Sequence, residues 1–168
     1  MKLLIQKIKS NKQFRNAAFL LMDFGESLIG TCLYSVTKII HWRTIMTITI
    51  IKENDVKIAV VSSREVLITD VQSALDFMAT VSLEAGCDRI ILNKSAVCED
   101  FFNLRTGLAG EILQKFINYH MKIAIVGDFS MYSSKNLKDF IYECNNGKDI
   151  FFLSNEKQAV EKLRISYS

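Results

Sequence analysis

Proline is absent from the 168 residues of this sequence, and nothing in the chain accounts for that absence. Cysteine is scarce: the four cysteines are scattered, none forms a C-x-x-C pair, and no secretory signal precedes them. This usage is typical of reduced thiols, so we expect a cytoplasmic protein without disulfides. A chain of this length buries roughly 70% of its unfolded surface and does not depend on such cross-links.

Histidine is also rare, which bears on catalysis. His41 precedes the predicted domain and His120 stands at the end of a predicted helix, so a Ser-His-Asp or Cys-His arrangement is not expected. The sequence contains no P-loop, no G-x-G-x-x-G motif and no His/Cys cluster with metal spacing. We therefore expect no enzyme activity, no cofactor and no bound metal.

The part of the chain after residue 45 is also not basic. The net charge of +3 divides unevenly, because residues 1–45 carry +5 and the remainder carries −2. A nucleic-acid-binding domain normally presents a basic face, so nucleic acid is not an expected partner.

From residue 46 onward, short apolar β-rich runs alternate with helical periodicity. The runs predict strands at residues 47–51, 57–62, 89–93, 121–126 and 150–153, of which the first two form a hairpin. Four helices are predicted: from a Thr69/Gln72 capping box to the Gly86 cap, over residues 107–120, from Ser133 or Ser134 to Asn146-Gly147, and after an Asn155 cap. This order predicts an α/β fold with a mostly parallel sheet of about five strands and an antiparallel edge strand.

Residues 1–45 do not follow this alternation and are predicted to form a helical extension of a domain at residues 46–168. Residues 17–40 are hydrophobic, but Asp23 and Glu26 interrupt them, so they fail the criterion of about 20 largely apolar residues for a transmembrane helix. Three interpretations stay open. The extension packs on the domain or on a second copy, it anchors the protein at a membrane through residues 17–40, or it is a start-site artefact and Met46 is the true start.

Polar residues follow the predicted parallel strands, at the edge of the sheet where such folds bind ligands and partners. A small anion could bind at the Thr106-Gly107 helix start, helped by the positive helix end, Arg105 and Lys94. Alternatively, Thr106 is only an N-cap and Arg105 only a solvated side chain. An enzyme using Asp128 with nearby Ser or Lys groups is a weaker hypothesis. The candidate binding residues are Asn93, Lys94, Ser95, Arg105, Thr106, Gly107 and Asp128, with Ser62, Ser63, Arg64 and Ser130 on the same edge.

Three motifs carry a resemblance to a known family: VVSSREVLITDVQSALD, LNKSAVCEDFFNLRTGLAGEILQKF and VGDFSMYSSKNLKDFIYECNNGKDIFF. They are similar to the bacterial domain-of-unknown-function family 4180, and residues 46–163 resemble the STAS, or anti-sigma-factor-antagonist-like, superfamily. The resemblance implies a STAS-like sandwich and a regulatory module that binds a protein partner without catalysis.

The superfamily resemblance also implies a switch, in which phosphorylation of a serine at a helix start breaks the complex. This chain departs from that pattern. Arg105 stands at the position of the phosphoacceptor serine and Leu104 at that of the preceding aspartate. Thr106 is then the remaining candidate phosphoacceptor. The sequence indicates neither the identity of the partner nor the oligomeric state.

Overall fold

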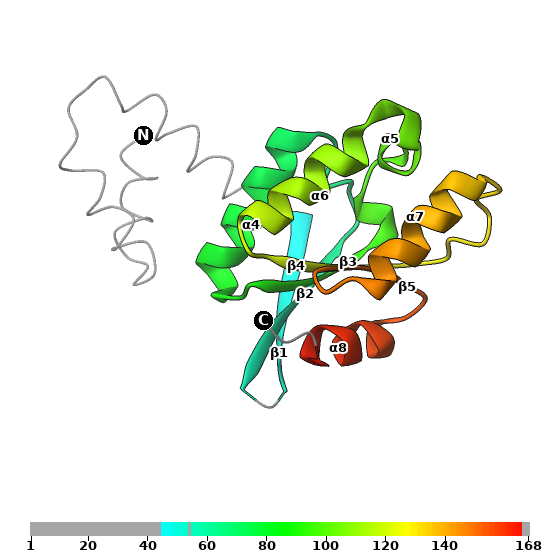
Figure 1. Ribbon diagram of the computed structural model, residues 1–168. Coiled ribbons are helices and arrows are strands. Elements are labelled where there is room, and N and C mark those ends of the chain that lie inside the picture. The colour runs from blue at the N-terminus through cyan, green and yellow to red at the C-terminus, as the bar shows by residue number, and fades with distance from the viewer. Residues whose placement is uncertain (1–44, 54, 166–168) are drawn as a thin grey trace, which may run out of the picture. The chain divides into compact units, whose positions relative to one another are not determined.

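The computed structural model describes residues 45–53 and 55–165. Its sheet has five strands in the order β1-β2-β3-β4-β5 (Figure 1). They are β1 (Met46–Glu53), β2 (Val56–Ser63), β3 (Arg89–Asn93), β4 (Lys122–Val126) and β5 (Ile150–Leu153). β1 pairs antiparallel with β2, and the other neighbours pair parallel. The predicted mixed sheet with an antiparallel edge strand is confirmed.

The helices in the described residues are more numerous than predicted. They are α4 (Val71–Ala85), α5 (Glu99–Phe102), α6 (Leu108–Asn118), α7 (Lys135–Asn146) and α8 (Glu156–Ile165), with 3-10 helices η2 (Lys94–Ala96) and η3 (Leu104–Thr106). The predicted count of four was therefore wrong, because α5 occupies a segment that we expected to be a loop. This single turn buries Phe101 and Phe102. It is too short to show a helical repeat in the sequence.

Hydrogen bonds of short polar side chains fix the helix ends. Gly86, with φ 60°, ends α4 as predicted. The N-cap of α4 is Asp70 rather than Thr69, because the Asp70 carboxylate accepts from the Ser73 N–H at 2.7 Å. Ser73 completes the capping box through its hydroxyl oxygen, which accepts from the Asp70 N–H at 2.9 Å, while Gln72 donates to Asp76 instead.

The later helices begin near the predicted residues. Ser134 and Asn155 accept from N–H groups three residues on, at 3.4 and 3.0 Å, and both predicted caps are confirmed. α6 is shorter than the predicted span of 107–120, because Gly107 and His120 have positive φ angles of 75° and 55°. These left-handed residues lie outside the helix at either end.

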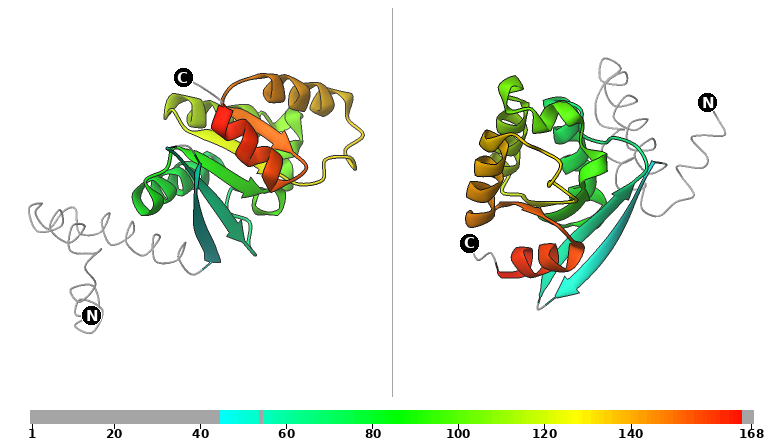
Figure 2. Two further views of the ribbon diagram at one scale, coloured as in Figure 1. Left: turned by 90° about the horizontal axis from the view of Figure 1, so that it is seen from below. Right: turned by 90° about the vertical axis from the view of Figure 1, so that its right-hand side faces the viewer.

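The strand register divides the apolar side chains between two layers. Ile58, Ile91, Ala124 and Phe151 form one face, on which Ala159 and Leu163 of α8 pack. The other face carries the buried side chains of Ala59, Ile90 and Ile123 and lies beneath α4, α6 and α7 (Figures 1 and 2). β3 and β4 are therefore buried on both faces, as their continuously apolar sequences predict.

The predicted extension covers residues 1–45, and all of these except Ile45 lie outside the described residues. Its three interpretations, including a membrane contact through residues 17–40, stay predictions, and so does the domain boundary before Met46. In residues 45–53 and 55–165, no helix is both long enough and apolar enough to span a membrane.

Candidate functional site

The connections that follow β3 and β4 meet around the side chain of Lys94. This side chain is only 15% exposed. Its Nζ atom lies 4.4 Å from the centroid of the Tyr132 ring and 5.6 Å from that of the Phe102 ring. A cation withdrawn from water gains most from such contacts with aromatic faces. Lys94 therefore holds the connection after β3 against the connection after β4.

Glu99, the first residue of α5, contacts both Lys94 and Tyr132. Its Oε1 atom lies 3.9 Å from Lys94 Nζ. Its Oε2 atom accepts a 2.8 Å hydrogen bond from the Tyr132 hydroxyl. Burial, that hydrogen bond and the negative charge of Glu99 together raise the pKa of Tyr132 far above its ordinary value. The hydroxyl consequently stays protonated and serves as a donor.

Aromatic rings extend this contact into the core. The Tyr132 ring stacks on Phe102 with centroids 5.3 Å apart. Phe129 lies 6.0 Å from Phe102 and meets Phe152 of β5 edge-on at 5.6 Å. Aromatic pairs of this geometry stabilise beyond the area that they bury. We refer to Lys94, Glu99, Phe102, Phe129 and Tyr132 as the packed corner.

The segment after β4 approaches Lys94 closely. A Cβ atom at Gly127 would stand 2.6 Å from the Lys94 Cβ, so a side chain at position 127 would push the two connections apart. Asp128 is exposed, and its Oδ1 atom accepts from the Ser130 N–H at 2.8 Å. Hydrogen bonds from Ser130, and to a lesser extent the charge of Lys94, lower the pKa of Asp128. The carboxylate thus stays ionised and holds this turn.

Arg105, Thr106 and Gly107 form a second feature, which we call the exposed turn. All three residues are exposed. The Thr106 hydroxyl lies 2.8 Å from the Asn103 carbonyl oxygen and 3.0 Å from that of Asp100, and it accepts from the Leu108 N–H at 3.2 Å. Asn103 Oδ1 accepts from the Arg105 N–H at 3.4 Å. These bonds fix the backbone and leave the Arg105 side chain in solvent.

The predicted site residues therefore fall into separate groups. Within the described residues, no hydrogen bond or ion pair joins Arg105 or Thr106 to Lys94 or Asp128. The short helix α5 connects the two features, since it contributes Phe102 to the packed corner and the Asp100 carbonyl to the exposed turn. Lys94 and Asp128 are near one another, whereas Arg105 and Thr106 belong to the start of α6.

The remaining candidates on this edge are dispersed. Asn93 is exposed, and its register opposite Val126 places it on the sheet face that α8 covers. Ser95 is exposed on η2. The Ser63 hydroxyl donates to the carbonyl oxygens of Ile45 and Glu65, at 3.0 and 2.9 Å, so it stabilises the end of β2.

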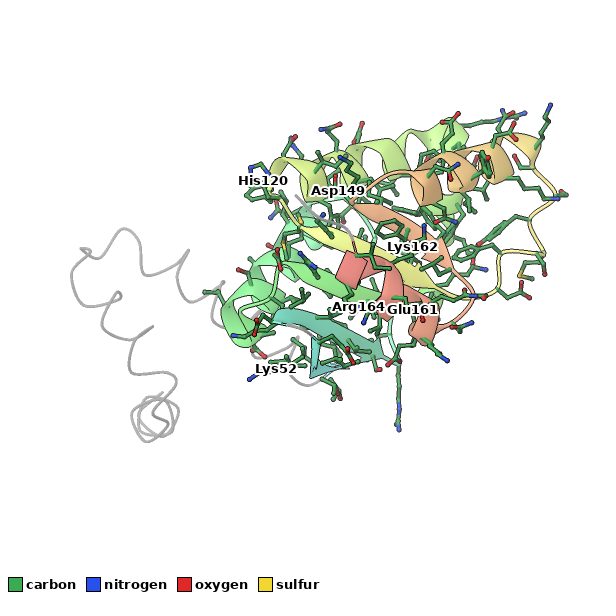
Figure 3. All side chains as sticks on the ribbon, turned by 60° about the horizontal axis from the view of Figure 1, so that its bottom comes forward. Lys52, His120, Asp149, Glu161, Lys162 and Arg164 are labelled. Atoms are coloured by element: carbon green, nitrogen blue, oxygen red, sulfur yellow. The ribbon has the colours of Figure 1, made fainter. Side chains whose placement is uncertain are left out.

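The one histidine among the described residues and two of the described cysteines lie away from these two features. His120 and Asp149 flank the amino ends of β4 and β5, on the opposite side of the sheet from the connection after β4 (Figure 3). Burial raises the pKa of Cys87, and burial with the nearby Glu143 charge raises that of Cys144 to about 11. His41 lies outside the described residues. Across the residues that the structure describes, no three His, Cys, Asp or Glu side chains gather closely enough to hold a metal ion.

The fold and these two features define a five-stranded α/β domain with a fixed cationic turn at the carboxyl edge of its sheet. The chain belongs to the family described as Domain of unknown function (DUF4180), whose sequence profile matches residues 53–163. The predicted family membership is thereby confirmed. The role of this family is not established.

Other comparisons add little to this assignment. A comparison with curated proteins found no match. Among solved structures, the chain is similar to a crystal structure from Thermotoga maritima that is provisionally described as an anti-sigma factor antagonist. The two chains are 16% identical, with 70% of this chain and 94% of that chain covered, and the TM-score is 0.37. A TM-score of this size carries no argument about shared fold or function.

Proposed function

We propose that this domain is a non-enzymatic, STAS-like regulatory module in the cytoplasm that binds a protein partner through the exposed turn. The observation that carries the proposal is the exposure of the Arg105 side chain on a backbone that hydrogen bonds hold in place. This side chain is exposed, whereas the backbone beneath it is fixed by the hydrogen bonds of Asn103 and Thr106. A fixed turn loses little conformational freedom on binding. An exposed guanidinium pairs with a carboxylate through two parallel hydrogen bonds, so the expected partner surface is acidic.

The resemblance to the STAS superfamily supports the same location. Its members bind a kinase or an anti-sigma factor at the helix start that corresponds to Arg105-Thr106-Gly107 here. Thr106 takes the role of phosphoacceptor in this proposal, because it is an exposed residue that follows Arg105 directly. A phosphate at Thr106 adds a charge of about −1.5 to −2, pairs with the guanidinium and so competes with an acidic partner.

Affinity capture from the native cell tests the proposal. The full chain serves as bait in three forms: wild type, Arg105→Glu, and Lys138→Glu as a matched charge reversal on the exposed surface of α7. We expect a specific protein whose recovery falls about tenfold or more with Arg105→Glu, because a reversed charge faces an acidic surface. Lys138→Glu should recover it at the wild-type level. Identical protein sets from all three baits would show that the exposed turn does not bind the partner.

A second candidate function is a small-anion sensor at the start of α6. The N-cap Gly107 supplies no side-chain acceptor there, and Arg105 stands beside it, which favours an anion. Two features oppose anion binding. The Thr106 hydroxyl already accepts from the Leu108 N–H, and Glu111 adds negative charge to the first turn. An anion at about 100 times its dissociation constant would stabilise the protein by about 2.7 kcal/mol. Thermal shift assays with phosphate, nucleotides and carboxylates that show no change, or an equal change in Arg105→Glu, would contradict this function.

A further inference from the structure

The two edge strands of the sheet, β1 and β5, differ in how their outer backbone groups are paired. β5 is four residues long, and the side-chain amide of Asn145 covers its edge. Asn145 Nδ2 donates to the Phe152 carbonyl oxygen at 2.9 Å, and Asn145 Oδ1 accepts from the Phe152 N–H at 2.7 Å. The amide thus makes the pair of bonds that a neighbouring strand would make. This blocks the edge against another chain.

β1 has no such protection in the described residues. It is eight residues long and pairs with β2 over its whole length, but no described strand or side-chain amide pairs with its outer edge. Backbone groups of a strand point alternately to either side, so about half of its residues direct N–H and C=O groups outward. Residues 46–51 carry no charge and no proline, and Ile50 is 44% exposed. Charged residues and proline are the usual protection of edge strands.

We propose that the outer edge of β1 pairs antiparallel with β1 of a second copy of this chain, which joins the two sheets across a two-fold axis. The sequence of β1 is self-complementary when the axis passes at Thr49. Ile48 then lies opposite Ile50 of the other copy, and Thr47 lies opposite Ile51. Each of these pairs shares one face of the joined sheet, as directly opposed residues must. The exposed Ile50 side chain is covered by Ile48 of the other copy.

Charge supports a second copy as the occupant in this register. Lys52 lies opposite Met46, so no two like charges oppose each other. Moving the axis to Ile50 would instead set Lys52 against Ile48 and replace the two symmetry-related Ile48–Ile50 pairs by a single Ile50–Ile50 pair. The end of the β1–β2 hairpin reaches beyond the rest of the sheet (Figures 1 and 2), and Lys52 lies at this end. An isologous contact of this kind closes at two subunits.

The oligomeric state of the full chain tests the proposal. Light scattering during gel filtration should show the mass rising from the monomer value of 19.2 kDa toward twice that value as concentration increases. Thr49→Lys sets two lysines directly opposite each other and should weaken dimerisation about tenfold or more. Thr49→Val keeps an uncharged β-branched residue and should dimerise like wild type. At a concentration where both variants are monomeric, their melting temperatures should be equal, which would show that both monomers fold.

Several outcomes would overturn it. A protein that stays monomeric up to about 1 mM does not dimerise through this edge. The edge would then be open to an extended peptide of another protein. Thr49→Lys that dimerises as tightly as wild type would place the dimer contact elsewhere. Cysteine cross-linking checks the register: Thr49→Cys should form a covalent dimer on mild oxidation, and Ser62→Cys on the inner strand β2 should not. Equal cross-linking of both variants would contradict the pairing.

Discussion

Lys94 and Arg105 are two cations in the single connection between β3 and α6, yet the fold gives them opposite surroundings. The Lys94 side chain is 15% exposed and lies between Glu99 and the rings of Tyr132 and Phe102. Arg105 is exposed on a turn that short backbone and side-chain hydrogen bonds hold in place. The packed corner uses a positive charge to join two connections. The exposed turn leaves its positive charge available to another molecule.

The difference shows that a charge in a loop cannot be assigned a role from its own neighbours in sequence. Tyr132, which faces Lys94, belongs to the connection after β4 and comes beside it only because β3 and β4 are parallel neighbours. Burial beside an aromatic ring turns a cation into a structural group. Variants that change stability without changing binding, and the reverse, test this difference between the two cations.

The largest effect is expected in the packed corner, from Phe102→Ala. This ring is buried and contacts Lys94, Tyr132 and Phe129. Its removal should lower the free energy of unfolding by about 3–5 kcal/mol, as for other buried phenylalanines. Urea denaturation measures the change. Tyr142→Ala on α7 is the control, because that ring is 70% exposed, and similar losses in both variants would contradict the packing described here.

Gly107→Ala tests whether the exposed turn depends on its backbone. Gly107 has φ 75° and no atom within 4 Å of an added Cβ, so the substitution acts through conformation alone. A left-handed alanine should cost about 1–2 kcal/mol. Gly110→Ala is a matched control within α6, again with open space, and it should stabilise the helix by up to about 1 kcal/mol. Changes of the same sign in the two variants would contradict the assigned turn.

Tyr132→Phe removes only the hydroxyl that donates to Glu99. At neutral pH the loss should be about 1 kcal/mol, because the Glu99 side chain is 76% exposed to water. The pKa of Tyr132 is raised in the folded state above its ordinary value of 10.0. The stabilisation is therefore complete below about pH 10 and declines as the pH rises toward the raised pKa. Wild type should lose stability more steeply above pH 10 than Tyr132→Phe, whereas Tyr119→Phe, on a ring 62% exposed, should follow wild type.

Sequence alone predicts the scaffold of this domain well. Alternating strand and helix patterns identify the five strands, and short-range caps such as Gly86 and Ser134 locate helix ends within a few residues. These features depend on contacts over one or two helical turns. The Asp70 cap was missed because two adjacent residues, Thr69 and Asp70, both suit the position. Of these two side chains, the Asp70 carboxylate is the one that accepts from the Ser73 N–H.

The packed corner could not be predicted in the same way. Its contacts join residues 94, 102 and 132, which no local pattern relates. The available signal was the density of aromatic residues after two strands that were expected to be parallel, at Phe101, Phe102, Phe129 and Tyr132. That signal places the rings at one edge of the sheet. It does not say that the Lys94 side chain turns toward them, because that direction depends on the α5 turn.

The smallest effect on stability is expected from Arg105→Glu, and it gives the sharpest test of the contrast. A side chain in solvent contributes little to folding, so the free energy of unfolding should stay within about 0.5 kcal/mol of wild type. Lys94→Glu introduces the same charge reversal eleven residues earlier. It should cost about 1–3 kcal/mol, since the new carboxylate faces Glu99 and loses the ring contacts. Urea denaturation compares the two variants at one salt concentration. If the two variants lose equal stability, Arg105 stabilises the fold as much as Lys94 does, and the exposed turn is not a surface that is free to bind a partner.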